Sequence, residues 1–195
     1  MSHRHETEIK LAVRNPRTLK RRLVELGFRR VKGRHFESNY LFDFPDLRLR
    51  KASCLLRVRL VDRHGVLTFK GAPLPSQEYK IRREIESAVA DGHQLREIFS
   101  CLGLREVFRY EKYRTVYAPP GKHDASQAPN LVYDETPIGN FVELEGPQRW
   151  IDKVAQQLGY ARTDYITASY GMLYRRWCEG REEEPGDLIF PNHKS

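Results

Sequence analysis

Charged and apolar residues alternate with a period of two along several short segments of the chain. In residues 5–13, Glu6, Glu8 and Lys10 occupy every second position, and from residue 9 onward aliphatic residues fill the positions between them. A β-strand with this period carries its charges on one face and its apolar side chains on the other. The pattern predicts strands in residues 5–13, 35–43, 78–87, 104–118, 131–136 and 140–146, and a hairpin in residues 53–71.

Other segments repeat their apolar residues every three or four positions, which is the period of an α-helix. In residues 15–28, Asn15 can cap the helix, Pro16 suits its first turn and Gly27 can end it. Helices are also predicted in residues 91–103, 147–159 and 164–177, and a polar loop in residues 119–130. We expect one domain in residues 1–177, followed by a charged, proline-containing tail in residues 178–195 that is poorly ordered.

The charged rows recur in strand after strand, and this recurrence bears on the fold. A single row is explained by a strand face that water covers. Over the whole set, however, the signs are segregated, with carboxylate pairs near both ends of the sequence and Arg or Lys pairs between them. The amphipathic helices also need the apolar strand faces to pack on, so the charged faces would point inward. We therefore predict an α+β fold, an eight-stranded antiparallel closed barrel with a polar interior and helices outside.

Composition limits the classes of partner and the cellular location of this domain, but it does not identify the partner. The 195 residues contain 34 Lys and Arg against 26 Asp and Glu, a formal net charge of +8, which favours polyanionic partners. No apolar run is long enough to span a membrane, and no secretory signal is visible. Three cysteines without metal-ligand spacing indicate ordinary thiols and a cytoplasmic location. A homodimer remains open.

A charged barrel interior needs partners for its charges. Pairs of carboxylates suit a hard divalent cation such as Mg²⁺ or Mn²⁺, and Arg and Lys suit phosphate oxygens. If the carboxylates and the cations surround one cavity, that cavity is suited to bind a metal–polyphosphate complex. The GxxxxGK[ST] phosphate loop is absent from the sequence, which excludes P-loop chemistry.

At this point the sequence resembles the CYTH family, also called triphosphate tunnel metalloenzymes. The family's E-x-E-x-K hallmark is matched by Glu6, Glu8 and Lys10. The later motifs follow in the family's order: Arg57-x-Arg59, Thr68-x-Lys70-Gly71, Arg82-x-Glu84-x-Glu86, Lys112-x-Arg114, Asp134 before Gly139-x-Phe141, Glu143-x-Glu145, and a closing Ser169-Tyr170 helix. E-x-E-x-K alone is a weak signal, but the ordered series spans residues 6 to about 174 and is specific.

The resemblance implies a tunnel that binds a triphosphate and a divalent metal ion. Carried over by motif, the metal ligands are Glu6, Glu8, Glu143 and Glu145, with Asp134 as a further ligand or as a carboxylate behind the ligands. The phosphate-binding residues are Lys10, Arg57, Arg59, Lys70, Arg82, Lys112 and Arg114. Glu84 and Glu86 would orient water, metal or the cations, and Lys10 and Arg59 would share in catalysis. For each residue, a purely structural ion pair is the alternative.

The family contains triphosphatases and class IV adenylyl cyclases, and both reactions remain open. Some of its cyclases carry a His-Phe pair before the first strand, whereas this chain has His3 and His5 without Phe. Nor does the final helix contain the lysine found in some of the triphosphatases. We expect hydrolysis of a triphosphate such as inorganic triphosphate, thiamine triphosphate or a nucleoside triphosphate. The alternatives are formation of cyclic AMP from ATP, and a non-catalytic polyphosphate or RNA binder. The paired glutamates disfavour nucleic acid, which they would repel.

Overall fold

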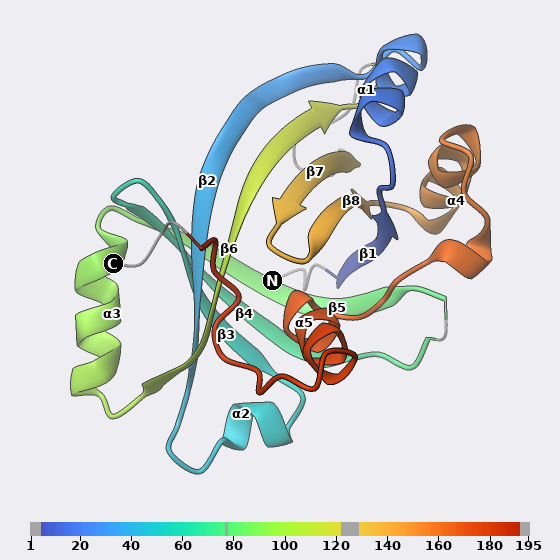
Figure 1. The fold of residues 1–195 in the computed structure, drawn as a ribbon. Coiled ribbons are helices and arrows are strands. Elements are labelled where there is room, and N and C mark those ends of the chain that lie inside the picture. The colour runs from blue at the N-terminus through green and yellow to red at the C-terminus, as the bar shows by residue number, and fades with distance from the viewer. Residues whose placement is uncertain (1–4, 77, 122–128, 192–195) are drawn as a thin grey trace.

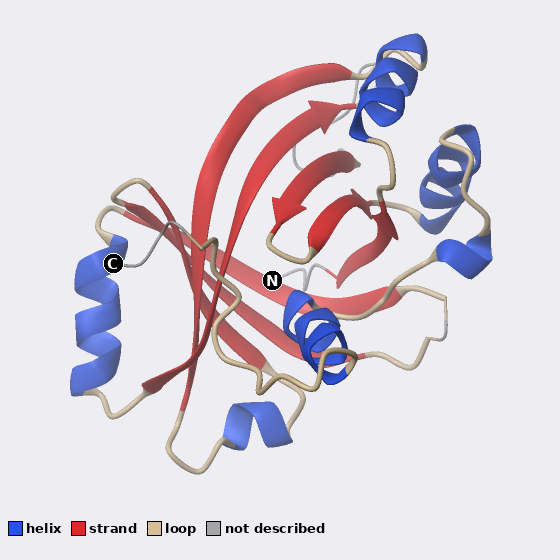
Figure 2. Ribbon diagram, in the orientation of Figure 1, coloured by secondary structure: helices blue, strands red, loops and turns tan. Residues whose placement is uncertain are grey.

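Antiparallel strands form a closed barrel in the computed structural model, which describes residues 5–76, 78–121 and 129–191 (Figures 1 and 2). The strands are β1 (His5–Ala12), β2 (Arg29–Asp43), β3 (Leu55–Val61), β4 (His64–Pro73), β5 (Lys80–Val89), β6 (Arg105–Ala118), β7 (Asn130–Thr136) and β8 (Gly139–Glu145). Around the barrel their order is β1-β5-β4-β3-β2-β6-β7-β8, and β8 pairs with β1. The predicted eight-stranded barrel is confirmed for these described ranges.

The helices lie outside the barrel, as the apolar strand faces predict. They are α1 (Pro16–Glu25), α2 (Arg48–Lys51), α3 (Gly92–Cys101), α4 (Gln148–Gln157) and α5 (Tyr170–Glu179), with a 3₁₀ turn at Arg162–Asp164. Asn15 and Asp91 cap α1 and α3 by accepting backbone N–H groups. Gly27 and Gly103 follow these two helices with φ of 78° and 85°, a conformation that favours glycine.

Two apolar clusters join helices to the outer faces of the strands, and a third joins α5 to inward-facing residues, of which Phe108 and Tyr110 also line the barrel cavity. The largest packs Leu19 and Leu23 of α1 and Ile151 of α4 against β1, β7 and β8. A second lies between α3 and strands β2 and β3, and a third joins α5 to β6 and β8. Because the apolar faces are used on the outside, the charged faces of the strands point inward.

Two element boundaries differ by six residues from the sequence-based prediction, and other boundaries differ by less. Strand β2 begins at Arg29, six residues before the predicted start, through a basic segment that pairs with β6. The final helix begins at Tyr170 instead of residue 164, because Ile166 pairs with Lys10 of β1 and Ser169 caps the helix by accepting from Met172 N–H. Of the predicted loop 119–130, residues 122–128 lie outside the described residues.

The described part of the predicted tail is packed against the barrel. Helix α5 continues to Glu179, and Leu188 exchanges backbone hydrogen bonds with β6 through Arg109 O and Glu111 N–H. Leu188 is 2% exposed and belongs to the third apolar cluster. Asp187 and Phe190 also bond to β6. The expectation of poor order from Cys178 onward therefore differs from the structure for residues 178–191.

We expect Leu188→Ala to lower the free energy of unfolding by about 2–3 kcal/mol, because it removes a buried side chain from a cluster that cannot fully collapse. Urea unfolding monitored by circular dichroism measures the change. Leu102→Ala is the matched control, since Leu102 is 67% exposed, and it should change stability by less than about 0.5 kcal/mol. Equal effects of the two substitutions would show that the segment around Leu188 does not stabilise the barrel.

No helix among the described residues is long and apolar enough to cross a membrane. The three cysteines are free thiols: Cys178 is buried, Cys54 is half-buried and Cys101 is exposed.

Candidate functional site

The barrel encloses a cavity of about 640 Å³ lined by charged side chains. Thirteen residues singled out from the sequence line it together: Glu6, Glu8, Lys10, Arg57, Arg59, Lys70, Arg82, Glu84, Glu86, Lys112, Arg114, Glu143 and Glu145. Asp134 is not among the lining residues. Counted over the described residues, nine Lys or Arg side chains and seven carboxylates line the cavity. The period-two rows from separate strands therefore converge on one space.

Three carboxylates on neighbouring strands are crowded at one part of the cavity. Glu6 of β1 lies beside Glu84 of β5, and Lys70 Nζ lies 2.5 Å from Glu6 Oε2 and 3.2 Å from Glu84 Oε2. Burial and the hydrogen bond with Glu6 raise the pKa of Glu84 to about 8. Burial and the negative charge of Glu6 raise the pKa of Glu145 to about 7. This part of the cavity therefore holds more negative charge than its lysine neutralises.

Glu8 and Glu143 share buried cations, so their charges are compensated. Glu8 Oε1 lies 2.6 Å from Lys80 Nζ and 3.5 Å from Lys10 Nζ, which is also 3.3 Å from Glu143 Oε1. Burial alone would raise the pKa of Glu8, but Lys10 and Lys80 outweigh it and hold the pKa below its usual range. Burial likewise opposes the charge of Lys10, yet Glu8 and Glu143 raise its pKa.

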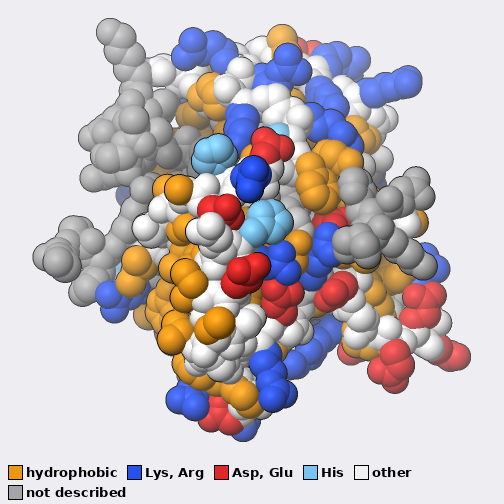
Figure 3. Space-filling view, turned by 90° about the vertical axis from the view of Figure 1, so that its left-hand side faces the viewer, with side chains coloured by type: hydrophobic (Ala, Val, Ile, Leu, Met, Phe, Trp, Pro, Cys, Tyr) orange, Lys and Arg blue, Asp and Glu red, His pale blue; other side chains and the backbone are white. Residues whose placement is uncertain are grey.

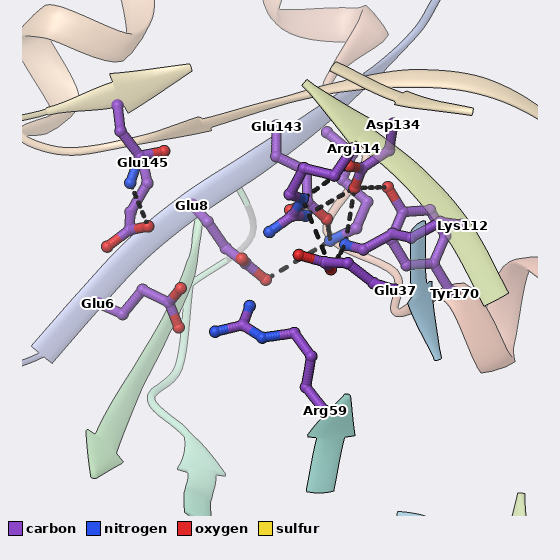
Figure 4. Close-up of polar contacts among 12 residues, drawn as sticks. Glu6, Glu8, Glu37, Arg59, Lys112, Arg114, Asp134, Glu143, Glu145 and Tyr170 are labelled. Atoms are coloured by element: carbon purple, nitrogen blue, oxygen red, sulfur yellow. Dashed lines mark hydrogen bonds and ion pairs between the residues drawn. The ribbon is translucent and has the colours of Figure 1, made fainter. Parts of the chain in front are cut away.

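Asp134 of β7 holds two phosphate-binding candidates in place from behind (Figure 4). Arg114 donates to both of its oxygens, at 2.7 and 2.6 Å, and Lys112 Nζ lies 2.8 Å from Oδ2. The Tyr170 hydroxyl donates to the same Oδ2 at 2.8 Å. Asp134 is fully buried. With these donors around its oxygens, it orients the cations that line the cavity.

Arg57 and Arg59 stand side by side on β3 and share Glu86 of β5. One guanidinium nitrogen of each lies 3.5 Å from Glu86 Oε1, which also accepts from the Thr68 hydroxyl at 2.8 Å. Arg57 Nε is buried and has no hydrogen-bond partner among the described residues. Figure 4 shows the Arg59 guanidinium pointing toward Glu6 and Glu8. These two arginines retain donors that can bind a ligand.

Arg82 lines the cavity but is bound to the backbone. Its Nε donates to Gly71 O at 2.6 Å, and its Nη2 donates to Ser53 O. These bonds tie β5 to β4 and to the segment before β3. Arg82 therefore offers fewer free donors to a ligand than the other arginines of the cavity.

The sequence analysis assigned no role to four charged or titratable residues that also line the cavity, Lys32, His35, Glu37 and Lys80. Glu37 is 3% exposed, and its oxygens lie 3.2 Å from His35 Nε2 and 3.8 Å from Lys112 Nζ. His35 and Glu37 lie two positions apart on β2, so the period-two rule applied to this strand could have identified them. Lys80 belongs to the period-two row of Arg82, Glu84 and Glu86, but it precedes the motif that these three residues form and so received no role.

The donor set fits a hard divalent cation. Carboxylate oxygens are the ligands that Mg²⁺ and Mn²⁺ prefer, and Glu6, Glu8 and Glu145 all line the cavity from the paired strands β1 and β8. In the described residues no three His, Cys, Asp or Glu side chains are already gathered as a metal site, and Lys70 and Lys80 bond to Glu6 and Glu8. Burial and the negative charge of Glu6 raise the pKa of Glu145, and a bound cation would stabilise the charged form of this carboxylate.

Comparison with protein families gives a match to the CYTH domain model over residues 4–170. A protein of Methanocaldococcus jannaschii named "Putative adenylate cyclase" is 32% identical over 140 residues, which cover 72% of this chain and 75% of that protein.

Solved structures with the same fold include proteins of low sequence identity. The "putative adenylate cyclase" from Vibrio parahaemolyticus has a TM-score of 0.72 at 17% identity, over 87% of this chain and 97% of that one. An adenylyl cyclase homologue from Hippeastrum, described as having a dominant triphosphatase activity, has a TM-score of 0.61 at 16% identity, over 92% and 97% of the two chains. These two likenesses establish the fold alone.

Proposed function

The chain belongs to the CYTH domain family, and from this premise we propose that it hydrolyses a triphosphate substrate inside the barrel with a divalent metal ion. The observation that carries the proposal is the composition of one cavity. Three crowded carboxylates, Glu6, Glu84 and Glu145, for which Lys70 is the one ion-pair partner among the described residues, lie in the same space as a set of Lys and Arg side chains. A triphosphate with its metal ion supplies the charges that both sets lack.

The phosphate oxygens are bound by cations from four strands. We assign this role to Lys10, Arg57, Arg59, Lys70, Lys112 and Arg114. Arg82 adds its positive charge to the cavity but few free donors, because its Nε and Nη2 donate to backbone oxygens. Arg57 supports the assignment because its buried Nε has no partner in the described part of the chain. Arginine can bind two phosphate oxygens at once, and lysine adds a compact charge. Together these cations neutralise charge that develops on the transferred phosphoryl group.

The metal ion, Mg²⁺ or Mn²⁺, would be held by Glu6, Glu8 and Glu145, with Glu143 as a further candidate ligand. When bound, such an ion polarises the phosphoryl oxygens. Binding of the substrate and metal would draw Lys70 and Lys80 away from Glu6 and Glu8 and toward phosphate. The lysine–carboxylate bonds therefore keep these side chains directed into the cavity until the ligand arrives.

Glu84 and Glu86 have different surroundings and take different roles. Glu86 lies between Arg57 and Arg59 and orients these cations. Glu84 has no arginine partner within ion-pair distance among the described residues, and its pKa of about 8 allows it to exchange a proton near neutrality. We assign it to orienting the attacking water. Lys10 and Arg59 stabilise the same step by charge. Asp134 positions Lys112 and Arg114 from behind the cavity wall, and Tyr170, which lines the cavity, donates its hydroxyl to Asp134.

Adenylyl cyclase activity is the second candidate. In that reaction the ribose 3′-hydroxyl attacks the α-phosphorus of ATP and pyrophosphate leaves. The apolar side chains Leu41, Leu55 and Phe108 line the cavity close to Arg57 and could receive a nucleobase. The name of the relative from M. jannaschii agrees with this candidate, whereas the Hippeastrum protein combines a cyclase name with dominant triphosphatase activity. A name within this family therefore does not decide the reaction.

We expect the purified protein to release orthophosphate from a triphosphate in the presence of Mg²⁺ or Mn²⁺. Incubation with ATP, tripolyphosphate or thiamine triphosphate, followed by separation of the products, measures this. Cyclic AMP and pyrophosphate from ATP would instead support the cyclase. Absence of turnover with all three compounds would overturn both enzymatic candidates and leave the binder, whose affinity for polyphosphate or RNA should not depend on metal. EDTA should abolish hydrolysis, and restored Mn²⁺ should recover it.

A further inference from the structure

One carboxylate outside the barrel accepts hydrogen bonds from two other segments of the chain. The Oδ1 atom of Asp152, on α4, accepts from the Tyr79 hydroxyl at 2.5 Å and from the Tyr165 hydroxyl at 2.9 Å. Its Oδ2 atom accepts from Arg162 Nη2 at 2.5 Å. Tyr79 stands directly before β5, and Arg162 and Tyr165 belong to the segment between α4 and α5. We call these four residues the Asp152 cluster.

The Asp152 cluster lies on the outer side of the barrel wall. In Figure 1, α4 is outside the barrel at the right, and the chain from α4 to α5 runs past the start of β5. Tyr79 is 5% exposed and belongs to the largest apolar cluster, and its ring centre lies 6.1 Å from that of Tyr165. The four described residues of the Asp152 cluster are absent from the cavity lining. Two hydroxyls on one oxygen therefore fix the two segments relative to each other from outside.

Both segments that the Asp152 cluster joins also pair with β1, at positions whose side chains line the cavity. Lys80, the first residue of β5, pairs with Glu8. Two positions further along β1, Ile166 takes the place of β5 and exchanges two backbone hydrogen bonds of 2.9 Å with Lys10. In each case the preceding residue is one of the two tyrosines. The Asp152 cluster therefore lies where the barrel wall changes from β5 to the segment before α5.

The start of β5 is weakly held within the sheet. The pairings of β5 with β4 end at Arg82, so at Lys80 the described strands give β5 a single neighbour, β1. A strand end of this kind opens more easily than the centre of a strand. Successive side chains of a strand point to opposite faces, so a Tyr79 side chain that is anchored outside directs Lys80 inward. There Lys80 Nζ lies 2.6 Å from Glu8 Oε1, and Lys10 Nζ lies 3.5 Å from the same oxygen.

We propose that Asp152 is a positioning residue for the cavity. From outside the barrel it fixes the start of β5 and the segment before α5, and through them the places of Lys80 and Lys10 beside Glu8. Its own side chain contacts neither substrate nor metal. The expected effect on turnover rests on the proposed hydrolase function, in which Lys80 moves from Glu8 to a phosphate. Displacement of such a group by about 1 Å can cost about a hundredfold in rate.

A double-mutant cycle between Asp152 and Lys80 tests this proposal. Asp152→Ala should lower kcat/KM for tripolyphosphate about tenfold, because it releases both tyrosine hydroxyls. In a Lys80→Gln background it should add at most about a threefold loss, the part that acts through Lys10. Asp152→Asn keeps an oxygen for both hydroxyls and should restore kcat/KM to within about twofold, although it loses the charge pair with Arg162. A role in stability alone would make the losses of Asp152→Ala and Lys80→Gln multiply.

Asp91→Ala is the matched control, because it removes an outer carboxylate that contributes to stability alone. Asp91 caps α3 by accepting from the N–H groups of His93 and Gln94. Helix α3 lies at the left of Figure 1, on the side of the molecule that faces the viewer in Figure 3, whereas α4 lies at the right of Figure 1. The control should lower the thermal midpoint and leave kcat/KM unchanged. The same behaviour from Asp152→Ala would overturn the inference.

Binding of tripolyphosphate without metal, measured by calorimetry, separates this inference from the proposed hydrolysis. If no triphosphate is hydrolysed but Asp152→Ala and Lys80→Gln weaken this binding without multiplying, the positioning role is supported and the hydrolase is not. If hydrolysis occurs but the two losses in kcat/KM multiply, the hydrolase is supported and the inference is wrong. Absence of both hydrolysis and binding would overturn both. If Asp152→Ala does not fold, Tyr79→Phe, which keeps the buried ring and removes only the hydroxyl, replaces it in the same cycle.

Discussion

Glu145→Gln should abolish turnover without destabilising the protein. Glu145 is assigned to the metal ion, and replacement even of residues that merely support a metal ligand commonly costs about 10- to 100-fold in affinity or activity. We therefore expect a loss of more than about a hundredfold in kcat/KM for the triphosphate that the unsubstituted protein hydrolyses. Binding of Mn²⁺, measured by calorimetry in the absence of substrate, should weaken in parallel.

The same substitution should leave stability unchanged or increase it at pH 8. The pKa of Glu145 is raised in the folded protein to about 7, so its charge opposes folding at pH values above the ordinary glutamate pKa. Glutamine removes that charge and can keep the hydrogen bond from Asn130 Nδ2, which lies 3.0 Å from Glu145 Oε2. Loss of activity through misfolding would instead lower the thermal midpoint.

Glu106→Gln is the control for this experiment. Glu106 is a carboxylate on the outside of the barrel that pairs with Arg96 at 2.7 Å. It should have the activity and the Mn²⁺ affinity of the unsubstituted protein. If Glu145→Gln retains both properties as well, the assignment of Glu145 to the metal ion is wrong.

The barrel could be predicted because its determinants are local and repeated. A period of two fixes which side chains share a strand face, and the helical stripes require the apolar faces, so the charged faces are left for the interior. Lys10, Arg57 and Glu143 could thus be assigned to one cavity without knowing the pairing of their strands. The register shifts around Lys32 depend on how β2 meets β6, and their local sign is Gly33, which lies between the shifted positions Lys32 and His35.

Contacts between distant segments account for what the sequence did not reveal. The segment after α5 has the composition of a mobile tail, but Leu188 fits an apolar site built by residues of β6, β8 and α5. Ile166 is extended because it pairs with Lys10, more than 150 positions earlier. The bonding of Arg82 to Ser53 O and Gly71 O likewise depends on tertiary structure. Such contacts override local preference.

Asp134→Asn should be strongly destabilising, with a loss of about 3 kcal/mol in the free energy of unfolding. Asp134 is fully buried, and its charge compensates Lys112, which is 2% exposed, and Arg114. Asparagine preserves the shape but leaves two buried cations with less negative charge and points an amide donor at one of them. For a chain of this length the thermal midpoint should fall by roughly 10 °C. Thermal unfolding in EDTA measures the change without any contribution from bound metal.

The two roles considered for Asp134 give opposite results in this experiment. A carboxylate that positions cations stabilises the protein whether metal is present or not, so Asp134→Asn loses stability in EDTA, and Tyr170→Phe, which removes one donor to the same oxygen, loses about 1 kcal/mol. A metal ligand would leave the stability in EDTA nearly unchanged and weaken Mn²⁺ binding as strongly as Glu145→Gln. Asp46→Asn, an exposed partner of Arg48, should change neither property and controls for the loss of any aspartate charge. Because Lys112, Arg114 and Tyr170 already bond to both oxygens of Asp134, we expect the first result.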